Sequence, residues 1–419
     1  MKKIYFLLVL CTIVSLKMYS QGCVGMRSPG GSGMFMQRPN SSAGPNYRMG
    51  PKGYSAKMAA KKGSTSGWTF SASNRYFQSF RHFSGTDEQK QRYTQGTEVI
   101  NKSYTLDLSV TRIFNQRWSM TLGVPVSIND RSSLYEHSDG QRHSTGDAGL
   151  GDIRVTAYRW LMDPKKSKNF NLQGGLGVKL PTGNYRANDY FITSTTGSRV
   201  LGPVDQSIQL GDGGLGINTE LNGFYNLGKK VSLYTNLFYL VNPRETNGIS
   251  TARGRTPTAA SVAYGSNVMS VPDQYMARLG ANVTISRFTL GAGARIDGVP
   301  VRDLAGGSNG FRRPGYVITA DPSLSYRTKK FTAFVNVPVA LERNRLQSVP
   351  DKIRTDLTKT YFVGDAAFAD YVVNFGVSFS FMKKIRKPAG NNRQFNNYRG
   401  HYHGGGYPVH SQRVRVISL

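Results

Sequence analysis

From Gly67 to Phe381 the chain alternates apolar and polar residues in segments of roughly ten to fifteen residues. In the segment 103–111, for example, four large apolar residues alternate with Ser, Thr and Asp. A period of two is typical of a β-strand with one apolar and one polar face. Strands of soluble sheets are usually about 5–6 residues long, whereas a strand tilted across a bilayer needs about 9–11. The pattern therefore predicts transmembrane β-strands.

Twelve such segments occur, and long and short connections alternate along the chain from beginning to end. The short connections cover residues 115–117, 163–169, 228–230, 286–287 and 327–330. The long ones cover residues 84–98, 130–147, 182–210, 244–272, 298–313 and 342–366. Outer-membrane barrels have an even number of strands, short periplasmic turns and longer outer loops. We therefore expect an all-β fold, a transmembrane antiparallel β-barrel of about twelve strands with both ends in the periplasm.

Three prolines, Pro125, Pro322 and Pro338, lie inside the predicted strands. Proline cannot donate to a ladder, and it is confined to strand ends, edges and bulges. We expect each of these residues to mark a strand end or a bulge.

The composition of the chain narrows the possible class of protein further. The chain is 38% hydrophobic and 19% charged, holds 47 glycines, and has no stretch of about 18 apolar residues, so a helical membrane protein is excluded. The net charge of +30 could indicate nucleic acid. However, Lys2 and Lys3 precede a short apolar run that ends near Ser20, which is the pattern of a secretory signal peptide. Export argues against a nucleic-acid partner.

Four regions follow from these patterns. Residues 1–20 are predicted to be a cleaved signal peptide, 21–66 a flexible periplasmic arm or plug, 67–381 the barrel, and 382–419 a basic periplasmic tail. Cys11 leaves with the signal, so Cys23 is the remaining thiol and no intramolecular disulfide is expected. Lipidation of Cys23 is an open alternative.

Two motifs carry a resemblance to a known family. They are Gly149-Leu150-Gly151-Asp152 and, after Gly175-Leu176-Gly177-Val178, the run Lys179-Leu180-Pro181-Thr182-Gly183. Together they resemble the outer-membrane barrel family named after the meta-pathway of phenol degradation. The resemblance covers roughly residues 67–381 and implies an integral outer-membrane protein that passes small, hydrophobic or aromatic compounds. It implies no particular substrate residues.

Strand parity points a set of charged side chains into the barrel, where they are candidates for lining a channel. These candidates are Arg75, Asp107, Asp152, Arg154, Lys179, Glu220, Arg278, Arg295 and Asp321. Positive and negative members nearly balance. Ion pairs across a narrow lumen would brace or constrict it, whereas a selective pathway is the alternative reading.

Catalysis, metal binding and nucleotide binding have weaker support in the sequence. His82 and His143 lie near serines, but neither is accompanied by a group that would orient it, so we expect no enzymatic activity. The methionines of the arm and the histidines of the tail, His401, His403 and His410, could bind soft metals, although a solvated segment explains them equally. No metal and no cofactor is predicted. Glycine pairs such as Gly213-Gly214 open no helix, which argues against nucleotide binding.

The sequence thus predicts an outer-membrane channel or transporter that passes small molecules passively. The alternative is a plugged structural or surface-interaction barrel through which nothing passes. The predicted partners are outer-membrane lipid, a small-molecule solute and, through the basic tail, anionic envelope components.

Overall fold

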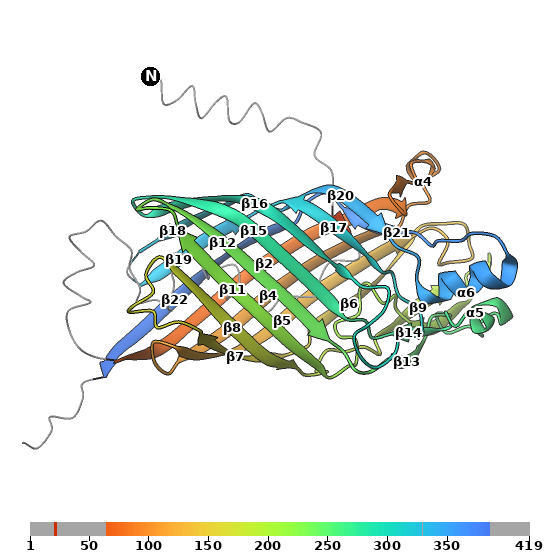
Figure 1. The fold of residues 1–419 in the computed structure, drawn as a ribbon. Coiled ribbons are helices and arrows are strands. Elements are labelled where there is room, and N and C mark those ends of the chain that lie inside the picture. Colours follow the sequence, from red (N-terminus) through yellow and green to blue (C-terminus); the bar gives the residue numbers. More distant parts are fainter. Residues whose placement is uncertain (1–20, 23–63, 329, 386–419) are drawn as a thin grey trace, which may run out of the picture. The chain divides into compact units, whose positions relative to one another are not determined.

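The fold is known from a computed structural model that describes residues 21–22, 64–328 and 330–385. The predicted signal peptide, nearly all of the predicted arm, and the predicted tail beyond Ile385 lie outside these residues. Figure 1 shows strands that wrap obliquely around a common axis, with the long connections gathered at one end. We call this end the loop end and the opposite one the turn end.

The wall is a closed antiparallel barrel of 12 strands, several of which are interrupted. The uninterrupted strands are β2 (Ser64–Ser84), β4 (Ile100–Ile113), β5 (Trp118–Ser133), β8 (Phe170–Lys179), β11 (Gly216–Asn226), β12 (Val231–Val241), β15 (Gln274–Ile285) and β16 (Phe288–Val299). The interrupted strands are β6 and β7 (His143–Leu150, Arg154–Trp160), β17 and β18 (Gly315–Ala320, Ser323–Arg327), β19 and β20 (Phe331–Asn336, Val339–Arg345), and β21 and β22 (Ala366–Ala369, Val373–Ile385).

The first and last strands close the barrel. β2 pairs with β4 on one side and with β22 on the other, where Trp68 lies opposite Phe381. The strands begin at Ser64 and end at Ile385, so the wall reaches slightly beyond the range 67–381 expected from the sequence. The predicted fold class is confirmed.

Each of the three strand prolines lies where a neighbouring ladder breaks. Pro125 faces the interruption between β6 and β7, and its carbonyl accepts from Gly151 N at 2.8 Å. Pro322 separates β17 from β18, and Pro338 separates β19 from β20. Their carbonyls accept from Val337 N and Val372 N, both at 3.1 Å. The missing backbone N–H of each proline is therefore tolerated, because it lies where one strand stops pairing with its neighbour and the next strand segment begins.

The two faces of the wall differ as the parity predicted. Large apolar side chains face outward, among them Leu176 at 62% and Leu279 at 63% exposure. Asn218, Thr319 and Ser378, from the inner positions, are buried. Among the described residues, no helix has the length and apolar character needed to cross a bilayer.

Aromatic side chains contact one another across neighbouring strands near the turn end. Phe331 lies 6.0 Å from Tyr326 and 6.2 Å from Phe379, and Tyr326 lies 5.0 Å from Phe288. Their strands meet the short turns, so this group forms part of an aromatic girdle of the kind found at membrane interfaces.

Short elements occupy the long connections at the loop end. They are β3 (Asp87–Glu88), α4 (Gln91–Thr94), the hairpin β9 and β10 (Asn188–Ile192, Arg199–Pro203), β13 and β14 (Thr246–Ser250, Val268–Ser270), α5 (Ala259–Ala263) and α6 (Val349–Thr358). In addition, β1 (Gln21–Gly22) pairs with β21.

Candidate functional site

The inner face of β2, β4 and β5 carries neutral polar side chains that bond across the strands. Thr105 Oγ1 lies 2.9 Å from Ser127 Oγ and accepts from Arg75 at 3.3 Å. Ser103 donates to Asn129 Oδ1 at 2.8 Å. These contacts form polar rows along the inner face of the three strands, which present a surface suited to water and polar solutes.

The two motifs that resemble the family fold against each other. Asp152, the last residue of the first motif, accepts from Lys179 Nζ at 3.2 Å and from Gly183 N at 2.9 Å. Thr182 Oγ1 donates to Gly151 O at 2.8 Å and accepts from Ile153 N at 2.9 Å. The motifs are therefore two halves of one structural unit, placed at the loop end of β8 and at the break between β6 and β7.

Lys179 is the centre of this unit. It is 1% exposed and lies between Asp152 and Asp212, to which its ammonium group is hydrogen-bonded. Asp212 also accepts from Gly214 N at 2.8 Å. One buried cation, Lys179, thus joins the wall strand β8 to the loop segment that precedes β11.

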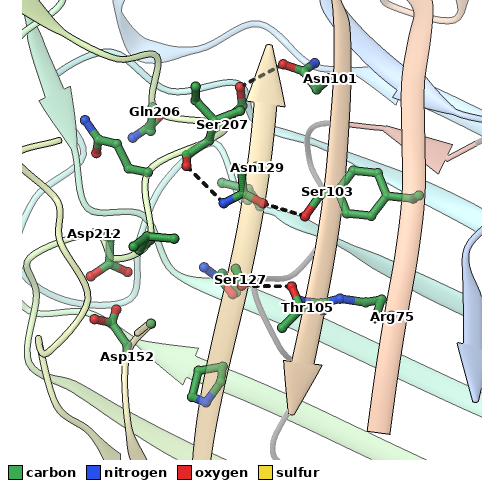
Figure 2. Close-up of a pocket in the computed structure, with 18 of the residues that line it drawn as sticks. Arg75, Asn101, Ser103, Thr105, Ser127, Asn129, Asp152, Gln206, Ser207 and Asp212 are labelled. Atoms are coloured by element: carbon green, nitrogen blue, oxygen red, sulfur yellow. Dashed lines mark hydrogen bonds between the residues drawn. The ribbon is translucent and has the colours of Figure 1, made fainter. Parts of the chain in front are cut away.

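Above the polar rows, the segment 206–210 forms the roof of a cavity. Figure 2 shows the roof residues Gln206 and Ser207 beside the inner faces of β4 and β5, with Asp152 and Asp212 below Gln206 on the same side of β5. Asn129 Nδ2 donates to Ile208 O at 3.0 Å, and Ser207 Oγ donates to Asn101 Oδ1 at 3.3 Å. The empty space between the lining atoms of the cavity is about 1240 Å³, and part of it is open to solvent.

The cavity lining combines charged and apolar side chains. Arg75, Arg154 and Lys179 reach it from the wall, and Ile208, Leu210 and Val299 supply apolar surface. It can therefore contact a small organic molecule through both its polar and its apolar parts.

Asp205 holds the roof to its surroundings. This buried carboxylate lies 2.8 Å from Arg313, 3.5 Å from Arg253 and 3.7 Å from Arg131, and Arg131 and Arg253 also bind Glu136. Burial alone would raise the pKa of Asp205, but the charges of these arginines outweigh burial and hold the pKa well below its usual range. The roof is therefore fastened by an ion cluster whose members come from several loops and from the end of β5.

A second set of charged side chains lies deeper in the lumen. Arg278 pairs with Asp321, which also accepts from Asn336 at 2.7 Å. Glu220 accepts from the Tyr158 hydroxyl at 2.9 Å, and Arg295 pairs with Asp297.

Strand pairing places seven of the nine predicted lumen candidates on inner positions, and the other two, Asp152 and Asp321, lie in the breaks between β6 and β7 and between β17 and β18. The structure brings together Asp152 with Lys179 and Arg278 with Asp321. Arg75 and Asp107 lie on the neighbouring strands β2 and β4, where Arg75 pairs with Thr105 and Asp107 with Ser73. Arg154 lies beside Lys179 in the β7–β8 ladder, and its guanidinium stacks on Phe238. Glu220 and Arg295 instead bind the partners named above. Whether these residues select a solute stays a prediction.

Sequence reasoning missed Asp205, Asp212, Asp297 and Arg313. Asp297 follows Arg295 at the next inward position of β16, so the same parity could have found it. The other three belong to connections without periodicity, and only the fold brings them to the lumen.

Comparison with known proteins identifies the family. The family model described as the MetA-pathway of phenol degradation matches residues 126–344, just over half of the chain. The chain belongs to this family. Both interlocking motifs lie inside the matched range. No curated protein matches the chain.

A solved structure shares the barrel fold. An outer membrane channel from Pseudomonas putida F1 is 12% identical with a TM-score of 0.50, over 76% of this chain and 96% of that one. The CymD monoaromatic hydrocarbon channel is 8% identical with a TM-score of 0.37, over 88% of this chain and 99% of that one. At such identities the likeness concerns the barrel alone.

Proposed function

We propose that this barrel is a passive outer-membrane channel for small molecules, including aromatic compounds. The observation that carries the proposal is the roofed cavity, which opens from a lumen lined by polar side chains. A barrel that served only as a scaffold would gain stability from an apolar interior, since burying charged groups costs free energy unless each is paired. A polar lumen instead offers a wetted surface.

The combination of polar and apolar side chains in the cavity lining favours amphipathic solutes. Wall side chains such as Arg75 and Asn129 can bond a hydroxyl or carboxylate, and the roof residues Ile208 and Leu210 can contact an aromatic ring. The lumen holds no reaction centre that we would assign, and we propose no enzymatic activity.

The terminal regions have proposed roles as well. Residues 1–20 act as a cleaved signal, the part of 21–66 that precedes β2 as an arm or plug, and the part of 382–419 that follows β22 as a basic tail that attracts anionic envelope components. These assignments rest on the sequence.

Liposome swelling tests the channel proposal. Vesicles that contain the purified protein should swell in isotonic solutions of small solutes, and swelling should slow as the size of the solute increases. Vesicles with heat-unfolded protein are the control. If both preparations swell equally slowly with every solute, the alternative of a plugged structural or surface-interaction barrel is favoured.

A further inference from the structure

The wall has a gap in its hydrogen-bond ladder between β20 and β21. β20 pairs with β17, and β21 pairs with β2. Among the described strands, no ladder joins β20 to β21, although Val339 at the start of β20 forms an isolated antiparallel bridge with Tyr371. Below the gap, Ala340 N donates to Asp370 O at 3.3 Å; above it, Gly85 and Arg345 exchange two backbone bonds. Between these two points, no described backbone bond joins the facing edges of β20 and β21.

The gap lies in a part of the wall that has an apolar outer side. Leu341 on β20 points outward and is 67% exposed. On the inner side, the rings of Phe83 and Phe368 meet at 5.5 Å and are buried. Backbone groups that face a bilayer without partners cost several kcal/mol each, and open edges invite pairing with other chains. An occupant that supplies backbone donors and acceptors would remove both costs.

The structure places such an occupant at the edge. The backbone of β1 runs antiparallel to β21, with Gln21 opposite Ala369 and Gly22 opposite Phe368. We propose that the N-terminal segment of the mature chain, beginning at Gln21, docks by strand addition into the gap between β20 and β21 and completes the barrel wall. Strand addition derives its affinity from main-chain bonds and requires no particular side chain, which suits a segment that begins with Gln and Gly.

The chain is long enough for this docking. β2 starts at the turn end with Ser64, and the gap lies toward the loop end. An extended chain covers about 3.3–3.6 Å per residue. Residues 23–63 therefore exceed the length needed to run beside β2, which has 21 residues. Tethering on the same chain also raises the effective concentration of the segment at the gap.

The register gives a direct test with the native thiol. If pairing continues by one residue, Cys23 lies opposite Ala367. Antiparallel partners have Cα atoms about 4.5–5.5 Å apart, within the range of about 4.4–6.8 Å that a disulfide spans. The variant Ala367→Cys, purified from the outer membrane and treated with a mild oxidant, should form an intramolecular disulfide to Cys23. A tryptic peptide that joins the two segments identifies the bond.

Matched controls test whether the disulfide depends on the position in the gap and on Cys23. Ala148→Cys places a thiol on β6, which pairs with neither β20 nor β21, and Ala367→Cys with Cys23→Ser removes the native thiol. A second pair, Gly22→Cys with Phe368→Cys in a Cys23→Ser chain, tests the observed register even if Cys23 carries a lipid. We expect several-fold more intramolecular disulfide at either gap pair than with Ala148→Cys.

Two results would overturn the proposal. One is crosslinking at both gap pairs that does not exceed the Ala148→Cys level. The other is a disulfide that joins two chains, because a second copy would then occupy the gap. Neither readout involves solute flux, so the docking and the channel proposal can fail independently.

Discussion

Neighbouring residues of one strand lie in two different environments in this barrel. In the middle of β12, Leu237 faces outward and is 42% exposed, while Asn236 faces the lumen, is buried and donates to Asn222 at 2.8 Å. The outer face needs only apolar surface, because lipid supplies no hydrogen bonds. The inner face needs a partner for every polar group, because each unpaired buried group costs free energy. The outer face therefore tolerates exchange among apolar residues, whereas the inner face depends on specific pairs.

The largest effect is expected where an inner pair is broken. Lys179→Met should leave Asp152 and Asp212 buried without their shared cation, at a cost of about 3–5 kcal/mol. The temperature at which the barrel unfolds in detergent should fall accordingly. Restoring the balance with Asp152→Asn and Asp212→Asn in the same chain should recover much of the loss. Equal unfolding temperatures for Lys179→Met and the parent protein would contradict the role of this cluster.

The stability of the roof should likewise depend on Asp205, but its loss should affect the roof and not the whole barrel. Asp205→Asn removes the carboxylate shared by Arg131, Arg253 and Arg313. We expect proteases to cleave the loop 182–210 much faster, with little change in the unfolding of the wall. Thr196→Ala, at the exposed tip of the same loop, is the control and should be cleaved like the parent.

The pH dependence of this effect has a defined sign. Because the pKa of Asp205 is lowered in the folded protein, its contribution is present above the ordinary aspartate pKa of about 3.9 and is lost only as the pH falls through the lower folded value. The roof of the parent protein should therefore resist proteolysis down to pH 4. Loss of resistance between pH 7 and 5 would show that other groups hold the roof.

A smaller effect tests the two faces directly. Leu237→Arg puts a charge in the lipid near the middle of the wall and should cost about 2–4 kcal/mol. Asn236→Arg, one residue away, loses the bond to Asn222 but keeps its charge in the lumen and out of the lipid, so it should cost less than Leu237→Arg. Unfolding in urea from lipid vesicles measures both variants. Equal destabilisation would mean that the register of β12 is shifted by one residue.

The wall could be predicted from the sequence because its signal is local. Alternation along β12 and β15 fixes which side chains face outward, and Pro125, Pro322 and Pro338 mark the ladder breaks. Parity also placed Asp152 and Lys179 in the lumen. It could not pair them, because a period of two specifies a face and not a partner.

The loop end could not be predicted in this way. Asp205, Asp212 and Arg313 lie in segments without periodicity, and their contacts arise from the folding of separate loops over the lumen. The gap between β20 and β21 was also beyond sequence reasoning, since the pattern of β20 resembles that of any paired strand.

We propose that solutes pass through the cavity beneath the roof, and single-channel conductance with a modified cavity residue tests this proposal most directly. Ser127→Cys in a Cys23→Ser chain places a thiol in the cavity, and Ile128→Cys places one on the outer face of the same strand. We expect discrete conductance steps for both proteins, and a bulky charged thiol reagent should reduce them for Ser127→Cys alone. An absence of conductance steps, or steps that the reagent leaves unchanged in both proteins, would contradict it.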